Sequence, residues 1–312
     1  MPLIKVIAGF FRLIRLPNLI FIALTQILLQ YCIYEPLYRP FVNDDDTRRF
    51  GFLVIASILI AAAGYIINDY FDIDIDQINK PSRLVVGKLI SKRGSIFLHF
   101  VFNAVGLVFT CLAIRSTQQV YLVFLNLGVV FLLWFYSVRY KKTLLVGNVI
   151  ISLLVAWVIV IFFLSKMDPI QLIRGADKSQ SIFYQLTILY AGFAFIATFI
   201  RELIKDVEDQ VGDRRHGCKT LPIMWGAVLT RAFIVSWVII LALLVIFVML
   251  YLLQLKMRIA FVYSFLFVLI PIFLLLKNLT KATTSKDFGK LSAQMKWLLL
   301  AGIISMIFFY SR

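Results

Sequence analysis

Charged residues are scarce in this sequence. Asp, Glu, Lys and Arg make up 15% of its 312 residues, whereas soluble globular domains carry about 25%. Hydrophobic residues reach 62%, with 29 Phe and 13 Tyr. This composition excludes most soluble folds, and it excludes intrinsic disorder, which requires low hydrophobicity. The sequence therefore predicts a protein whose surface faces lipid.

Histidine and cysteine are also rare. The histidines are His99 and His216, and the cysteines are Cys32, Cys111 and Cys218. No pair of cysteines has metal-ligand spacing, and the pattern is not that of a disulfide framework. A metal site built on His or Cys is therefore not expected.

Long apolar runs dominate the chain. A membrane-spanning helix needs about 20 mostly apolar residues, and nine stretches qualify. They are 16–33, 51–67, 96–114, 120–138, 144–165, 182–200, 232–255, 259–276 and 291–310. Pro271 is expected to kink the eighth stretch, and 34–50 is expected to be a long loop. The predicted fold is an all-α polytopic membrane protein.

Positive charge is distributed unevenly between the two sides of this predicted arrangement. With the N-terminus in the cytoplasm, cytoplasmic segments hold 22 of the 32 Lys and Arg residues. Cytoplasmic loops of membrane proteins carry such an excess of Lys and Arg. The pattern predicts a multi-pass protein of the cell membrane, plasma or inner, with the N-terminus and the long charged loops in the cytoplasm. It also explains the net charge of +16 without invoking nucleic acid.

Two acidic clusters share one spacing, i, i+3, i+7. The first consists of Asp69, Asp72 and Asp76, and the second of Asp206, Asp209 and Asp213. They follow the second and the sixth predicted spans, and basic residues follow each of them. We expect one transmembrane domain over 1–312. It contains a pseudo-repeat of two four-helix units, at about 16–138 and 144–276, followed by a ninth helix.

The spacing places the carboxylates of each cluster on one helix face. Like charges repel there unless a cation lies between them. Oxygen-only ligands select hard cations such as Mg²⁺, usually held by one or two carboxylates plus substrate phosphates. Two such faces on one membrane side could bind Mg²⁺ around one diphosphate and neutralise it as a leaving group. Nearby basic residues could assist; they are Arg83, Arg139, Lys141, Lys142, Lys205, Arg214, Arg215 and Lys219.

The paired clusters resemble the motifs of the UbiA superfamily of intramembrane prenyltransferases. The family's first motif, N-D-x-x-D-x-x-x-D, is matched from Asn68 to Asp76, and its second, D-x-x-D-x-x-x-D, from Asp206 to Asp213. Members have nine helices, with these motifs at the ends of helices two and six. The resemblance implies a helix bundle with a central cavity and cytoplasmic Asp-rich loops. It also implies Mg²⁺-dependent transfer of a prenyl group from a polyprenyl diphosphate to a lipid-soluble acceptor, with no obligatory protein partner evident.

Residue by residue, the resemblance implies the following roles. The expected metal ligands are Asn68, Asp72, Asp76, Asp209 and Asp213, with Asp69 and Asp206 as supporting ligands or orienters. The residues expected to be essential for catalysis are Asp72, Asp209 and Lys141. The expected diphosphate contacts are Arg83, Arg139, Lys141, Lys205 and Asn18. No general base is identifiable.

The acceptor is indicated by a resemblance to one branch of the family. The stretch from Asn68 to Arg83, together with Arg201-Glu202, is most similar to members related to digeranylgeranylglyceryl phosphate synthase. Those members prenylate a hydroxyl of geranylgeranylglycerol phosphate. Leu84-Val85-Val86-Gly87 departs from the Arg-Pro that many members have here. An aromatic acceptor of the 4-hydroxybenzoate type stays open.

Two other functions are compatible with a polytopic protein. A cation transporter also uses intramembrane carboxylates, but near the membrane midplane, whereas no Asp or Glu falls inside a predicted span here. A lipid-binding scaffold would explain the positive charge but not two aspartate clusters of equal spacing. Metal-dependent prenyl release would favour the enzyme, and ion flux without it would favour the transporter.

Overall fold

The chain is almost entirely helical in the computed structural model, which describes residues 3–39, 42–79, 81, 84–167 and 177–310. These residues contain no strand; an isolated bridge pairs Val86 with Ile90. Nine helical stretches in this described part are long and apolar enough to cross a membrane. They are Leu16–Tyr38, Asp44–Phe71, Lys92–Ala113, Thr117–Val138, Val146–Lys166, Lys178–Glu208, Gly226–Gln254, Arg258–Lys281 and Ser285–Phe309. All nine predicted spans, and the predicted all-α membrane fold, are confirmed.

The elements fall into two compact units, each described by itself. Unit 1 comprises residues 1–30, 37–141 and 158–184, and unit 2 comprises 31–36, 142–157 and 185–312. The helices that lie in unit 1 are α1 (Leu3–Leu13), α2 (Leu16–Leu28), α4 (Asp44–Phe71), α5 (Ile73–Asn79), α6 (Lys92–Ala113) and α7 (Tyr121–Val138). Those of unit 2 are α11 (Gln210–Arg215), α12 (Leu221–Met224), α13 (Gly226–Gln254), α14 (Arg258–Ser264), α15 (Ile270–Lys281) and α16 (Ser285–Ile304).

Two long helices contribute to both units, α8 (Val146–Lys166) and α10 (Lys178–Glu208). The predicted pseudo-repeat, 16–138 and 144–276, stays a prediction.

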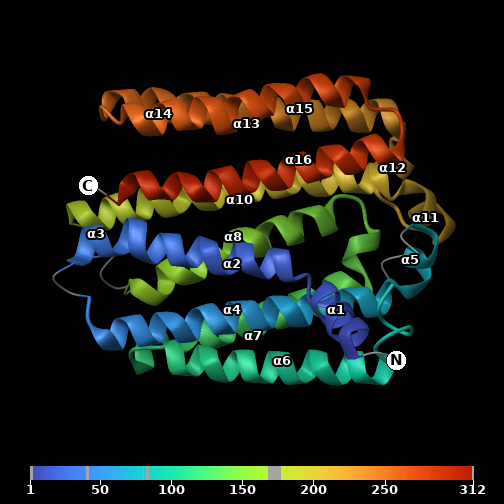
Figure 1. Cartoon of the computed structure of the whole chain (residues 1–312), viewed down its shortest axis with the longest axis horizontal. Coiled ribbons are helices and arrows are strands. Elements are labelled where there is room, and N and C mark those ends of the chain that lie inside the picture. Colours follow the sequence, from blue (N-terminus) through green and yellow to red (C-terminus); the bar gives the residue numbers. More distant parts are fainter. Residues whose placement is uncertain (1–2, 40–41, 80, 82–83, 168–176, 311–312) are drawn as a thin grey trace. The chain divides into compact units, whose positions relative to one another are not determined.

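In unit 1, α4 packs against α2, α6 and α7, and Figure 1 shows it running alongside α6. Small residues allow these close approaches, as is usual between membrane helices. A methyl group at Gly64 would lie 2.8 Å from Leu133 on α7, and one at Gly106 on α6 would lie 2.9 Å from Ile60 on α4. Large apolar side chains on the outer faces stay exposed, such as Phe97 and Phe124, each 68% exposed. Lipid, not water, suits such a surface.

In unit 2, α13 packs against α14 and α15, and α15 packs against α16, as Figure 1 shows in orange and red. The predicted kink at Pro271 coincides with a change of helix type. The π-helix η5 (Phe265–Leu269) lies between α14 and α15, and the proline occupies the first turn of α15. A proline lacks the N–H that an unbroken α-helix needs. The wider π turns accommodate that interruption.

Two segments differ from the sequence prediction. The predicted loop at 34–50 is largely helical, because α3 (Glu35–Tyr38) extends the first span and α4 begins at Asp44. The Asn43 side chain caps α4 by accepting a hydrogen bond from the Asp46 amide at 2.9 Å, which favours a helix start there. Helix α1, before the first span, was not predicted. It leaves Ile4, Ile7 and Phe11 exposed, a pattern of an amphipathic helix at a lipid surface.

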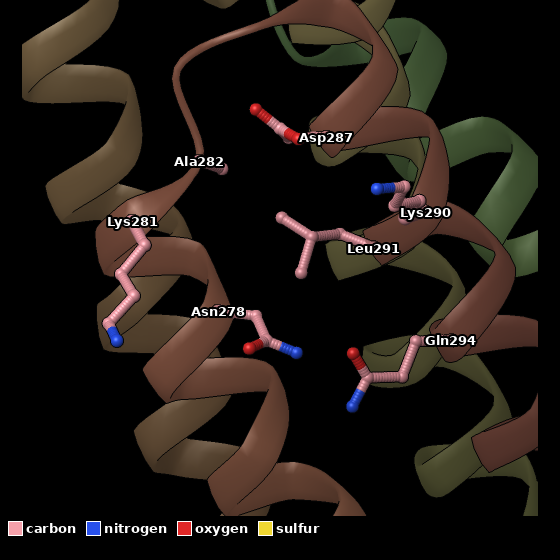
Figure 2. Close-up of a pocket in the computed structure, with 7 residues that line it drawn as sticks. All are labelled: Asn278, Lys281, Ala282, Asp287, Lys290, Leu291 and Gln294. Carbon is pink, nitrogen blue, oxygen red and sulfur yellow. The ribbon is translucent and has the colours of Figure 1, made fainter.

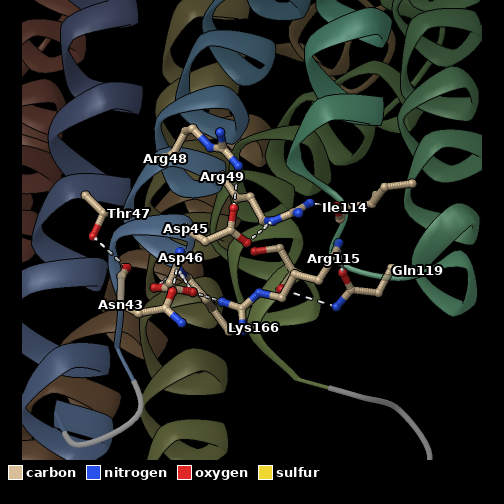
Figure 3. Close-up of polar contacts among 11 residues, drawn as sticks. Asn43, Asp45, Asp46, Thr47, Arg48, Arg49, Ile114, Arg115, Gln119 and Lys166 are labelled. Carbon is tan, nitrogen blue, oxygen red and sulfur yellow. Dashed lines mark hydrogen bonds and ion pairs between the residues drawn. The ribbon is translucent and has the colours of Figure 1, made fainter.

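A buried ion-pair network closes the α4 N-terminal end of unit 1 (Figure 3). Asp46 is 5% exposed, and both of its carboxylate oxygens accept hydrogen bonds from the Lys166 ammonium, at 3.0 and 2.9 Å. Arg115 forms a further ion pair with it, and Gln30 donates to it at 3.3 Å. The Lys166 ammonium also lies 5.5 Å from the centroid of the Phe50 ring. The network joins α4 to the π-helix η1 (Leu29–Tyr34) that follows α2, to the α6–α7 connection and to α8.

We expect Asp46→Asn to destabilise the protein by about 3–5 kcal/mol, because it leaves the buried Lys166 ammonium without its compensating carboxylate. The unfolding free energy in a mild detergent would measure this. Arg48→Ala is the matched control, since the Arg48–Asp45 pair is exposed and should contribute little. Equal stability of the Asp46→Asn variant and the wild type would contradict a structural role for the network.

Candidate functional site

The first aspartate cluster lies where α4 ends and α5 begins. Asp72 stands between the two helices with φ −93° and ψ 1°, outside the helical region. The helical hydrogen-bond pattern nevertheless continues through it: the Asp72 amide donates to the Asn68 carbonyl at 3.0 Å, and the Asp76 amide to the Asp72 carbonyl at 2.8 Å. Sparsely populated backbone of this kind is common at active sites.

The cluster's side chains are partly covered. Asp69, Asp72 and Asp76 are all half-buried, whereas Asp74, which lies outside the motif, is exposed. Asn68 donates from Nδ2 to the Asp72 carboxylate at 2.7 Å, which fixes that carboxylate against the helix. The motif aspartates therefore differ from their neighbour Asp74 in burial.

A cation from outside the motif contacts the first cluster. The Arg15 guanidinium donates to the Asp69 carboxylate at 2.9 Å and lies 4.9 Å from the centroid of the Tyr65 ring. Burial alone would lower the pKa of Arg15. The negative charge of Asp69 and its hydrogen bond to the guanidinium outweigh this effect, with smaller contributions from Tyr65 and Asp72, so the pKa of Arg15 is raised above its usual value. The guanidinium therefore stays charged, and it holds Asp69 in place.

Arg15 was not among the site residues predicted from the sequence. Its backbone has φ 51° and ψ 54°, which is the left-handed region that non-glycine residues rarely adopt. This corner separates α1 from α2 and turns the guanidinium toward α4. The available signal was Pro17 two residues later, at the start of α2, because proline favours a first helical turn. Asn18, a predicted diphosphate contact, donates to the Tyr65 hydroxyl at 3.3 Å.

A second cation contacts the central aspartate. Lys141, in the 3₁₀ turn η4 (Tyr140–Lys142), forms an ion pair and hydrogen bond with Asp72. The Lys141 side chain is 9% exposed and that of Asp72 is 16% exposed. The two residues are 69 positions apart in the chain, so the fold brings together two residues that were predicted separately. Arg139, at the end of α7, is exposed, and Arg83 lies outside the described residues.

The second aspartate cluster repeats the local geometry of the first. Asp209 stands between α10 and α11 with φ −93° and ψ 3°, within a few degrees of the angles at Asp72. The Asp209 amide donates to the Lys205 carbonyl at 2.9 Å, and the Asp213 amide to the Asp209 carbonyl at 3.2 Å. All three aspartates of this cluster are half-buried. The equal spacing in the sequence thus corresponds to one local structure that occurs twice.

The surroundings of the second cluster differ from those of the first. Asp206 accepts a hydrogen bond at 2.8 Å from the Asn148 side chain on α8, a neutral amide where the first cluster has arginine. Lys205 lies 3.9 Å from the Glu202 carboxylate, which also pairs with Arg201. In the same unit the Lys219 amide donates to the Lys142 carbonyl at 2.8 Å. Asn148 was not among the residues predicted from the sequence, and nothing in its spacing links it to Asp206.

Neither cluster is a preformed metal cage. Among the described residues, no three His, Cys, Asp or Glu side chains gather closely enough to hold a metal ion. The spacing distributes each cluster over two helical turns, and protein groups already contact Asp69, Asp72 and Asp206. Mg²⁺ is usually bound by one or two carboxylates together with substrate phosphates. The oxygen-only donors on each face fit such a shared site.

Known proteins are similar to this chain in sequence. The model of the UbiA prenyltransferase family matches residues 40–300. A digeranylgeranylglyceryl phosphate synthase from Methanospirillum hungatei is 33% identical over 183 residues, which cover 57% of this chain and 58% of that protein. Another, from Sulfurisphaera tokodaii, is 30% identical over 220 residues, 70% of either chain. The match thus covers less than two thirds of the first of these relatives.

Solved structures share the fold. A structure described as giving insights into digeranylgeranylglyceryl phosphate synthase in membranes has a TM-score of 0.61 and 23% identity, and covers 97% of this chain and 99% of that one. A UbiA homologue from Archaeoglobus fulgidus bound to GPP and Mg²⁺ has a TM-score of 0.57 and 16% identity, and covers 96% and 99%. With the family model matching most of its length, this integral, multi-pass membrane protein belongs to the UbiA prenyltransferase family.

Proposed function

We propose that this protein transfers a prenyl group from a polyprenyl diphosphate to the hydroxyl of a lipid acceptor, in a Mg²⁺-dependent reaction. The observation that carries this proposal is the repeated corner: two motifs, each with its central aspartate between two helices and its three aspartates half-buried. A UbiA homologue of this fold is described as bound to GPP and Mg²⁺. That description supports a prenyl diphosphate and this metal for the present chain.

In this proposal some motif residues bind the metal ions and others orient those ligands. The metal ligands are Asn68, Asp72, Asp76, Asp209 and Asp213. Asp69 and Asp206 orient them, which the contacts from Arg15 and Asn148 support. Bound Mg²⁺ would supply Lewis-acid stabilisation of the departing diphosphate.

The chain's basic residues would hold the diphosphate. Lys141 is the best placed, because its ammonium already lies against Asp72 and could contact a phosphate oxygen bound there. Arg83, Arg139, Lys205 and Asn18 are the further proposed contacts.

The proposed acceptor is a geranylgeranylglycerol phosphate-type lipid. Several relatives named digeranylgeranylglyceryl phosphate synthase support it, at 28–35% identity. The motif-bearing ends are proposed to face the cytoplasm from the cell membrane, because that arrangement places the excess of Lys and Arg inside. Prenylation of an aromatic acceptor of the 4-hydroxybenzoate type would replace this acceptor assignment, and ion flux without prenyl transfer would replace the enzyme by a transporter.

Asp72→Ala and Asp209→Ala should each lower Mg²⁺-dependent turnover by at least about 100-fold, since electrostatic stabilisation of the leaving group is lost. Purified protein would be incubated with geranylgeranyl diphosphate and either geranylgeranylglyceryl phosphate or 4-hydroxybenzoate, and products identified by mass. Asp74→Ala is the matched control, because Asp74 is exposed beside the motif, and it should keep full activity. Full activity of both motif variants would rule out the mechanism.

Metal binding can be tested apart from turnover. Mg²⁺ with inorganic diphosphate should stabilise the wild-type protein against unfolding, by about 2.7 kcal/mol at 100 times the Kd. Asp72→Asn and Asp209→Asn should lose most of this stabilisation, while Asp74→Asn keeps it. Thermal unfolding with and without EDTA is the measurement. Stabilisation that survives in both motif variants would show that the ligand binds elsewhere.

Arg15→Gln should weaken the apparent Mg²⁺ affinity by about 10–100-fold, the usual effect of removing a group that orients a metal ligand. The Mg²⁺ concentration at half-maximal turnover would show this. Arg15→Lys should recover part of the affinity because it keeps the charge. Arg12→Gln removes an equal charge from the exposed face of α1 and should have no such effect; the same response in both variants would mean that only net charge matters.

A further inference from the structure

A polar pocket lies in unit 2 at the ends of α15 and α16, and no residue of the aspartate motifs lines it. Its volume is about 290 Å³. Its lining residues are Asn278, Lys281, Ala282, Asp287, Lys290, Leu291 and Gln294. Figure 2 shows the carboxamides of Asn278 and Gln294 facing each other across the gap between the two helices, with Leu291 above them in the view.

The two helices present matching stripes of residues. Leu274, Asn278 and Lys281 lie at i, i+4, i+7 on α15, and Lys290, Gln294 and Trp297 lie at i, i+4, i+7 on α16. Residues at these spacings share one helix face. Because the chain reverses direction between the helices, each stripe runs from a lysine at the helix end, through an amide, to a large apolar side chain deeper in the span. Leu274 is 48% exposed and Trp297 71% exposed.

The pocket's charge favours an anion. Lys281 and Lys290 oppose one carboxylate, Asp287, and that carboxylate is engaged in capping α16. Its Oδ2 atom accepts hydrogen bonds from the amides of Thr283 and Thr284 at 3.3 and 3.1 Å, and from the Thr284 hydroxyl at 2.7 Å. In Figure 2 the Lys290 amine points toward the gap, whereas the Lys281 amine points away from it, although Lys281 is among the residues that line the pocket. Two ammonium groups would repel a metal cation.

The pocket lies at the same end of unit 2 as the second aspartate cluster. The Ser285 hydroxyl, which begins α16, donates to the Glu208 carbonyl at the end of α10 at 2.8 Å. Gly289 adjoins the Glu208 side chain, and a methyl group there would lie 3.1 Å from its carboxylate. The lysines therefore stand at the membrane surface that carries Asp206 to Asp213, with apolar side chains extending from them toward the membrane interior.

We propose that this pocket binds the phosphate headgroup of a membrane lipid, with the lipid chains lying over Leu274 and Trp297. Lysine is a compact ammonium donor suited to phosphate, and basic pockets between membrane helices bind anionic headgroups. The Asn278 amide adds a neutral donor, whereas the Gln294 amide donates to the Pro271 carbonyl at 3.1 Å. A glycerol phosphate bearing apolar chains fits both stripes. The source is either a bulk anionic phospholipid or a phosphorylated prenyl lipid, and the experiment separates them. The site is independent of the proposed reaction.

The test is lipid binding by the full chain, measured by native mass spectrometry in detergent. Phosphatidic acid should bind in preference to phosphatidylcholine of the same chain length. The variant with Lys281→Gln and Lys290→Gln together should bind phosphatidic acid about 30-fold more weakly, since each lysine near a surface contributes roughly five-fold. Lys286→Gln, which removes an exposed charge of α16 outside the pocket, should leave binding unchanged.

Two further arms identify the ligand. Trp297→Gln should weaken lipid binding, and glycerol 3-phosphate should not displace the lipid at equal concentration, because it lacks the chains. Because geranylgeranylglyceryl phosphate is also the proposed acceptor, the source is identified from the double variant. A larger loss of binding for geranylgeranylglyceryl phosphate than for phosphatidic acid would identify the prenyl lipid, and the reverse order the bulk phospholipid. An equal loss of phosphatidic acid binding in the double variant and in Lys286→Gln would contradict binding at this pocket. Equal binding of the lipid and of glycerol 3-phosphate would contradict the assignment of a lipid as the ligand.

Discussion

Carboxylates at the ends of apolar helices require compensation, and this requirement organises much of what the structure shows. A charge removed from water is costly unless an opposite charge or a hydrogen-bond donor contacts it. In unit 1 the carboxylates of Asp46, Asp69 and Asp72 each have a cationic partner from a distant part of the chain. These pairs bring together segments that apolar packing alone would not place in a defined register.

The two ends of α4 use this compensation differently. Asp46 and Lys166 are almost fully buried, at 5% and 2% side-chain exposure, and both carboxylate oxygens are engaged. Such a pair leaves no room for a ligand and serves to hold four segments together. Asp69 and Asp72, at 21% and 16% exposure, remain open on one side. A carboxylate that has an ion-pair partner but is still partly exposed can bind a metal ion, either beside that partner or in its place.

The membrane helices and the aspartate motifs could be predicted from sequence because each depends on local pattern. Apolar runs specify spans wherever backbone groups must be satisfied within the segment, and fixed spacing on a helix places Asp69, Asp72 and Asp76 together. The partners could not be predicted in the same way. Arg15 depends on a left-handed corner, Lys141 on a turn 69 residues away from Asp72, and Asn148 on how α8 meets α10. The start of α4 was missed because an acidic segment, capped by Asn43, looked like a loop.

The same backbone conformation therefore occurs in both motifs, but the side chains that contact the motif aspartates differ. At Asp72 and Asp209 the angles agree within a few degrees, yet the aspartate three residues earlier contacts arginine in one motif and a neutral amide in the other. The corner is set by the motif itself, since the same hydrogen bonds run through it in both places. The partner of the first aspartate of each motif depends on the neighbouring segment, which supplies Arg15 in one case and Asn148 in the other. A repeated motif thus preserves how its carboxylates are presented, while the surroundings determine how much of their charge the protein has already neutralised.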